Sequence, residues 1–181
     1  HTHSPVNNSF TYGFFGRLGH SKGIDILLTA SKLFYELSPD FKLILIIPKT
    51  PKKLYNKILN DIDIKGLSNN IEIKSDLSRN ELYETLCSLH CLVVPSYNEG
   101  FCFAAVETIG LGIPIIASYN SALKEVISGK HLFLYNNDAN DLFQQLIKAK
   151  EGDFIVDNIK QFHLTDSINK YHDFYNNDIK Q

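Results

Sequence analysis

Two segments of this sequence combine residue types that could do chemistry on a charged ligand. The first, residues 16–23, reads GRLGHSKG and lies between an aromatic run and a helix-like segment. Backbone N–H groups at a helix N-terminus, together with the cations of Arg17 and Lys22, suit a diphosphate. The order of residues is neither that of a P-loop nor G-x-G-x-x-G. The alternative is an ordinary turn that only caps the following helix.

The second segment, residues 95–107, places two carboxylates around a glycine. Glu99 follows an apolar run, and Gly100 lets the backbone approach a ligand closely. A helix is predicted from Phe101 onward, and its first N–H groups have no partners within the helix. Glu107 lies two turns further on and faces the same end. A carboxylate at such a place can accept two hydrogen bonds from the vicinal hydroxyls of a sugar, as in dinucleotide-binding folds.

The residues next to Glu107 in the sequence are apolar, and this bears on whether Glu107 binds a ligand. Ala104, Ala105, Val106 and Ile109 surround it in the sequence, and a charge in such surroundings is costly unless it has partners. We therefore favour a ligand-binding role for Glu107. The alternative is that Glu99 caps a helix and that Glu107 is a solvated surface residue.

The elements that position these segments alternate between strands and helices. Apolar runs predict strands at residues 12–15, 42–47, 70–74, 91–94, 114–117 and 131–135. Helical periodicity and caps predict helices at residues 24–37, 51–63, 78–89, 103–111, 121–127 and 138–150. This alternation predicts an α/β fold, a Rossmann-like, doubly wound parallel sheet in three layers. Ligands of such sheets bind beyond the carboxyl ends of the strands, where both segments lie.

Length and composition fit one domain over residues 1–181, with residues 152–181 as a polar tail that we expect to be helical. The net charge of −2 gives no electrostatic reason to expect a nucleic-acid partner. The longest apolar run, residues 43–48, is too short to span a bilayer. Because the chain contains no Met, we interpret it as a piece of a longer protein.

Other reactive residues are interpreted as structural. Asp61 and Asp63 have the D-x-D spacing of some metal sites, but the polar helix that carries them indicates solvated surface. We therefore expect no metal site. His20 either contacts a phosphate or caps a helix, and both interpretations stay open. His90 and the cysteines Cys87 and Cys91 are predicted to be structural, with the cysteines as small core residues.

Taken together, these motifs resemble one family. Glu99 and Glu107, with seven residues between them, resemble the E-x7-E signature of family 4 of the retaining glycosyltransferases, which have the GT-B architecture of two Rossmann-like domains. Residues 15–30 are similar to the donor diphosphate loop and following helix of that family, and residues 110–117 to the segment after its acidic motif. The chain departs from the pattern at Cys102 and Ser75, where glycine is common in the family.

The resemblance implies a role for each residue. Arg17 and Lys22 would bind the donor diphosphate and neutralise the leaving group, Glu107 would hold the ribose hydroxyls, and Glu99 would contact the transferred sugar. Arg17, Lys22 and Glu99 are thus the implied catalytic residues. The loop of residues 74–77 would flank the base. The full implied donor site comprises Gly16, Arg17, Lys22, Ser75, Leu77, Glu99, Gly100, Phe101, Cys102, Phe103 and Glu107.

The function implied is transfer of a hexose-type sugar from a UDP- or GDP-sugar to a glycan or glycolipid, as in polysaccharide or lipopolysaccharide biosynthesis. No cofactor is implied. The acceptor would bind an N-terminal domain that this chain lacks, so we expect the chain by itself to bind the donor without transferring sugar. A cytoplasmic protein is expected, and peripheral association with the inner face of the membrane stays open. Two alternatives also stay open: a non-catalytic nucleotide-sugar-binding module and a nucleotide-sugar epimerase of GT-B type.

Overall fold

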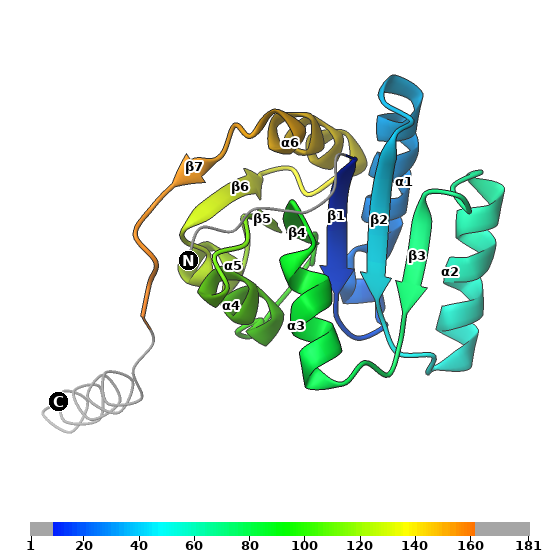
Figure 1. Ribbon diagram of the computed structural model, residues 1–181, viewed down its shortest axis with the longest axis horizontal. Coiled ribbons are helices and arrows are strands. Elements are labelled where there is room, and N and C mark those ends of the chain that lie inside the picture. Colours follow the sequence, from blue (N-terminus) through cyan, green and yellow to red (C-terminus); the bar gives the residue numbers. More distant parts are fainter. Residues whose placement is uncertain (1–8, 162–181) are drawn as a thin grey trace, which may run out of the picture.

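The computed structural model of the chain describes residues 9–161, which form one sheet with helices on both faces (Figure 1). The strand order is β3-β2-β1-β4-β5-β6-β7. All pairs are parallel except β6 with β7. The strands are β1 (Phe10–Phe15), β2 (Phe41–Ile46), β3 (Ile71–Lys74), β4 (Cys91–Val94), β5 (Ile115–Ser118), β6 (Lys130–Leu134) and β7 (Ile155–Val156). The chain therefore reverses its direction of strand addition between β1 and β4.

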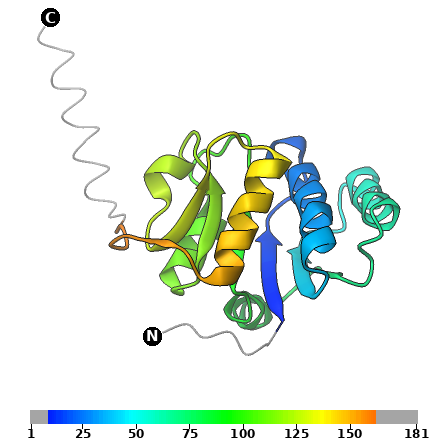
Figure 2. The ribbon, with the colours of Figure 1, turned by 90° about the horizontal axis from the view of Figure 1, so that it is seen from above.

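The helices divide between the two faces of the sheet. Figure 2 shows α1 and α6 side by side on one face, and α2 also contributes buried residues to this face. On the other face, α3, α4 and α5 pack over the core. Their bounds are α1 (Ile24–Leu37), α2 (Lys52–Ile64), α3 (Arg79–Cys87), α4 (Phe103–Gly110), α5 (Leu123–Val126) and α6 (Ala139–Glu151), and a 3₁₀ turn, η1 (His20–Lys22), precedes α1. The predicted three-layer, Rossmann-like fold is confirmed.

Residues 43–46 of β2 are all apolar, without the alternation of a half-exposed strand, because both faces of the strand are buried. Leu43 and Leu45 pack into the core under α1, whereas Ile44 and Ile46 pack into the core on the opposite face. All four are buried. Burial of such a side chain stabilises the fold by roughly 1.5–3 kcal/mol, so a central parallel strand with helices on both faces selects apolar residues at consecutive positions.

Local caps define several helix ends as predicted. Ser78 Oγ accepts a hydrogen bond from Glu81 N at 3.4 Å, and Glu81 Oε2 accepts from Ser78 N at 2.8 Å, which completes the capping box of α3. Asp138 Oδ1 accepts from Asp141 N at 2.8 Å at the start of α6. These contacts satisfy N–H groups that have no partner within their own helix.

The segment after α6 differs from the prediction of a helical tail. Residues Ile155–Val156 form β7, which pairs antiparallel with the first residues of β6. Asp157 N then donates to Gly129 O at 3.0 Å, and Lys160 Nζ donates to Glu125 O at 2.7 Å. The edge of β6 offers backbone partners at long range, and these contacts override the weak local preference of a polar segment. Residues 162–181 lie outside the described part of the chain. Within residues 9–161 no helix is both long enough and apolar enough to cross a bilayer.

Candidate functional site

The two segments singled out in the sequence meet at the carboxyl ends of β1 and β4. Residues 16–23 follow β1 and residues 95–102 follow β4, and these strands are hydrogen-bonded neighbours. A cleft of about 340 Å³ opens between them. It is lined by Arg17 and Lys22 on one side and by Glu99 and Glu107 on the other. This is the point at which the strand order reverses, the usual binding position in open α/β sheets.

Two contacts hold the segments against each other. Tyr97 N donates to Ser21 O at 2.8 Å. Gly23, at a φ of 67°, lies so close to the other loop that a Cβ there would sit 2.0 Å from Pro95 O. Only glycine combines this left-handed backbone with the absence of a side chain. The relative position of the two loops therefore depends on the absence of a side chain at Gly23.

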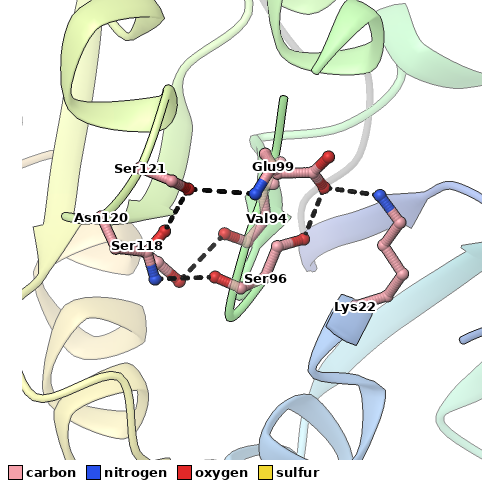
Figure 3. A network of polar contacts seen from close by, with 7 residues as sticks. All are labelled: Lys22, Val94, Ser96, Glu99, Ser118, Asn120 and Ser121. Atoms are coloured by element: carbon pink, nitrogen blue, oxygen red, sulfur yellow. Dashed lines mark hydrogen bonds and ion pairs between the residues drawn. The ribbon is translucent and has the colours of Figure 1, made fainter. Parts of the chain in front are cut away.

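Lys22 and Glu99 form an ion pair inside the cleft. Lys22 Nζ donates to Glu99 Oε1 at 2.7 Å, and Ser96 Oγ donates to the same oxygen at 2.7 Å (Figure 3). The two charged side chains are only 19% and 10% exposed. Because the surrounding protein screens the charges less than water does, such a pair is stronger than one at the open surface. The structure thus brings together a cation and a carboxylate that the sequence assigned to different parts of one ligand.

A third loop, after β5, supports the acidic segment. Glu99 N donates to Ser121 Oγ at 3.0 Å, and Asn120 Nδ2 donates to Ser96 O at 3.0 Å (Figure 3). The sequence analysis missed both Asn120 and Ser121. A signal was present, because these polar residues directly follow a buried strand, the same criterion that selected the other two segments.

Glu107 lies on α4 and lines the cleft, as predicted, but it is exposed. The argument from its apolar neighbours is therefore wrong. Ala105 and Ile109 turn into the core, whereas Glu107 lies on the outer side of the same helix. The pKa of Arg79 is raised, chiefly by its hydrogen bond to Tyr83 Oη at 2.9 Å, and the negative charge of Glu107 adds to the effect.

Helix α4 begins at Phe103, in agreement with the predicted helix 103–111, and not at Phe101, from which its free N–H groups were expected. Cys102 precedes it with a φ of 66°, and its carbonyl oxygen accepts from Ala105 N at 3.0 Å. This left-handed conformation favours glycine, so it accounts for the glycine that is common here in the family that the chain resembles. Burial raises the pKa of the Cys102 thiol, which lies in the wall of the cleft. Gly100 lies in the loop just before, where a Cβ would meet only open space.

A second hollow of about 330 Å³ continues from the cleft. The two share Phe15, Gly16 and Arg17 as a common wall, and the far side is formed by residues 74–77 with Pro48. Ser75 Oγ donates to Ile47 O at 2.7 Å, so its hydroxyl holds the loop in place. Leu77 gives this hollow an apolar wall. The cleft with its charged side chains and the hollow with its apolar wall therefore adjoin along residues 15–17.

The other reactive residues that the sequence pointed out lie outside this site. Asp61 and Asp63 lie on α2, and no cluster of three or more metal-ligating side chains occurs in the part of the chain that the structure describes. His20 lines a separate hollow of about 100 Å³ between α1 and α2. His90 Nδ1 accepts from Thr11 N at 3.0 Å, in agreement with a structural role.

Cys91 and Cys87 differ in burial. Cys91 is fully buried in β4, as predicted. The prediction for Cys87 is wrong, because the residue lies exposed at the last position of α3. Helix α3 buries Thr85 and Leu86, and the next residue turns toward solvent.

Comparison with known proteins relates the chain to one group. The sequence profile of the family described as "Glycosyl transferases group 1" matches residues 3–173. An uncharacterized glycosyltransferase of Methanocaldococcus jannaschii, MJ1178, is 32% identical over 142 residues, which cover 77% of this chain and 38% of the relative. The matched part of the chain thus covers well under half the length of that protein.

Solved structures share the fold. The C-terminal domain of LpcC, a glycosyl transferase group 1 family protein of Francisella tularensis, superimposes with a TM-score of 0.69 at 21% identity, over 78% of this chain and 75% of that domain. The Anabaena protein Alr3699/HepE, solved in complex with UDP-glucose, superimposes with a TM-score of 0.70 at 21% identity, over 80% of this chain and 40% of that protein.

Proposed function

The chain belongs to the group 1 glycosyltransferases, and from that premise we propose that its cleft binds the nucleotide-sugar donor of a retaining hexosyltransferase. One observation carries the proposal. Residues 16–23 and 95–107, far apart in the sequence, meet in a single cleft that presents two cations and two carboxylates. A nucleoside diphosphate sugar needs both kinds of group, cations for its phosphates and acceptors for its hydroxyls.

The diphosphate is proposed to lie between Arg17 and Lys22. Negative charge develops on this group as the bond to the sugar breaks, and fixed cations aimed at it lower the barrier. Both side chains line the cleft, and Lys22 is held in place by Glu99 before any ligand enters. Two side-chain cations supply the neutralisation for which other enzymes use a divalent metal, so we propose binding that does not require a metal.

The remaining parts of the donor are assigned to the adjoining walls. The ribose hydroxyls are assigned to Glu107, and the transferred sugar to Glu99 with the backbone of residues 100–103. The base is assigned to the second hollow, between Leu77 and the shared wall at Phe15. The UDP-glucose complex of the Anabaena protein supports a uridine nucleotide of a hexose as the first donor to test.

The reaction of the whole protein is likewise a proposal. It moves the hexose, with retained anomeric configuration, to a glycan or glycolipid in polysaccharide or lipopolysaccharide biosynthesis. An N-terminal domain of the GT-B architecture is proposed to hold the acceptor. Closure of two domains around the donor would exclude water and position the acceptor.

Calorimetry with a panel of UDP- and GDP-sugars, with and without EDTA, tests the proposal. Binding of at least one nucleotide sugar, with unchanged affinity in EDTA, is the expected result. Failure of every nucleotide sugar, or a strict need for a divalent metal, would contradict it. Product analysis of the whole protein then separates transfer to an acceptor from epimerisation of the donor or from binding without chemistry.

A further inference from the structure

The loop after β5 forms hydrogen bonds with the backbone of Glu99. Glu99 N donates to Ser121 Oγ at 3.0 Å, and Ala122 N donates to Glu99 O at 3.4 Å. Both backbone polar groups of Glu99 are therefore bound by two consecutive residues of one loop. This arrangement limits rotation of the peptide planes on either side of Glu99, and with them the direction of its side chain.

Asn120 closes the contacts into a ring. Its Nδ2 donates to Ser96 O at 3.0 Å, and its Oδ1 accepts from Ser121 Oγ at 3.2 Å. Ser96 Oγ in turn donates to Glu99 Oε1 at 2.7 Å. The hydroxyl of Ser121 accepts one hydrogen bond and donates another at the same time, which neither Ala nor Gly can do. In Figure 3, Asn120 and Ser121 lie on the side of Glu99 away from Lys22, and Ser96 lies below Glu99.

The backbone conformation of Ser121 is unusual for a serine, which indicates that the hydroxyl has a role. Its φ is 38°, in the left-handed region that favours glycine. Glycine would satisfy the backbone at lower cost but would leave Glu99 N without its acceptor. An unfavourable conformation that persists beside a candidate site points to a role for the side chain that occupies it.

Resting on the proposed function, we infer that Asn120 and Ser121 are positioning residues that orient Glu99 toward the transferred sugar and so determine how strongly that sugar is recognised. Neither residue lines the cleft. They act through Glu99, whereas the diphosphate and the ribose are assigned to Arg17, Lys22 and Glu107. Loss of the Ser121 hydroxyl should therefore weaken recognition of the sugar and leave recognition of the nucleotide largely intact.

The test compares two affinities within each variant. Calorimetry on the full 181-residue chain gives the Kd for UDP-glucose and the Kd for UDP. If the parent binds guanine nucleotides more tightly, GDP-mannose and GDP are used instead. Ser121→Gly should lower the affinity for the nucleotide sugar relative to the nucleoside diphosphate by about threefold or more, a typical effect of one lost hydrogen bond. Its melting temperature should fall less than that of Ser121→Ala, because both variants lose the hydroxyl but only glycine accepts the φ of 38°.

Two further variants make the test specific. Ser121→Ala should lower the same affinity ratio and lower the melting temperature further, because it loses the hydrogen bonds of the hydroxyl and keeps the unfavourable backbone. Asn137→Gly is the matched control. Asn137 is another left-handed residue after a strand, with a φ of 52°, and its side chain accepts from Ser118 Oγ at 2.5 Å without contacting the Glu99 loop. In Asn137→Gly, the ratio of the affinity for the nucleotide sugar to the affinity for the nucleoside diphosphate should equal that of the parent.

The outcomes separate this inference from the function on which it rests. A Ser121→Gly variant that keeps the parental ratio would overturn the positioning role alone. An equal fall in Asn137→Gly would also overturn it, because the effect would then belong to the whole sheet edge. Failure of the parent to bind any nucleotide sugar would overturn the proposed function and the positioning role together.

Discussion

Lys22 and Glu99, 77 residues apart in the sequence, form an ion pair of 2.7 Å across the cleft. The carboxylate has a second donor, Ser96 Oγ, on the same oxygen. Lys22 belongs to the loop assigned to the diphosphate, and Glu99 to the loop assigned to the sugar. Each residue thus keeps the other in place before the donor arrives. Under the proposed function, we expect an entering diphosphate to compete with Glu99 for the ammonium group, and we expect this competition to couple the two ends of the site.

Lys22→Ala should weaken binding of a nucleoside diphosphate at least about tenfold and weaken binding of the nucleoside much less. A charge-assisted hydrogen bond is worth roughly 1.5–3 kcal/mol, and the variant also leaves Glu99 as an unneutralised charge beside the phosphates. Calorimetry with UDP and uridine measures both effects. Lys52→Ala, an exposed lysine of α2, is the control and should change neither. Equal losses for the two ligands would indicate a displaced loop instead of a lost phosphate contact.

Glu107→Gln should lower the affinity for UDP about tenfold, because the neutral amide forms weaker hydrogen bonds with the ribose hydroxyls. Stability should be unchanged, since Glu107 is exposed. The corresponding loss for 2′-deoxy-UDP should be smaller, because that ligand lacks one of the two hydroxyls. Calorimetry on the parent and the variant with both ligands completes a cycle of four affinities. An equal loss for the two nucleotides would place Glu107 away from the ribose.

Gly23→Ala should destabilise the chain more than Gly66→Ala, although both glycines have nearly the same φ, 67° and 68°. Ala in this region costs about 1–2 kcal/mol at either position. At Gly66 a Cβ meets nothing within 4 Å, whereas at Gly23 it would sit 2.0 Å from Pro95 O. The clash should add roughly 1–3 kcal/mol and push the two loops apart.

Urea denaturation measures the difference between these two glycine variants, and calorimetry measures its effect on the site. Nucleoside diphosphate affinity should fall in Gly23→Ala and stay unchanged in Gly66→Ala. Equal stabilities of the two variants would show that the loops can separate without cost.

Alkylation should distinguish Cys102 from Cys87. Burial raises the pKa of Cys102, and because the thiolate is the nucleophile, its population grows only at more alkaline pH. At pH 7.5 iodoacetamide should therefore modify the exposed Cys87 first, with Cys102 reacting appreciably only as the pH rises. Mass spectrometry of digested samples follows both sites. A Cys87→Ser variant isolates the slow reaction, and UDP should slow it further because Cys102 lines the cleft. Rapid alkylation of Cys102 at neutral pH would contradict the burial of its thiol.

The sequence by itself determined the class of fold and most of its elements. The apolar run of residues 43–46 in β2 and the capping box at Ser78 are local features, because periodicity and caps depend on residues only a few positions apart. The two loops of the cleft could also be predicted from the sequence. Their glycines and charges directly follow predicted strands, and parallel strands bring their carboxyl ends to one edge.

Only the tertiary structure decided how the residues of this edge are connected. The exposure of Glu107 depends on which side of α4 faces the core, and the β7 pairing of Ile155–Val156 depends on an open edge of β6. Ser121 shows the limit most clearly. Its contact with Glu99 spans 22 residues, which include α4 and β5, and it requires a φ of 38° that no local pattern predicts for serine. Such contacts follow from the strand order, because packing of the whole sheet, and not local propensity, sets which loops become neighbours.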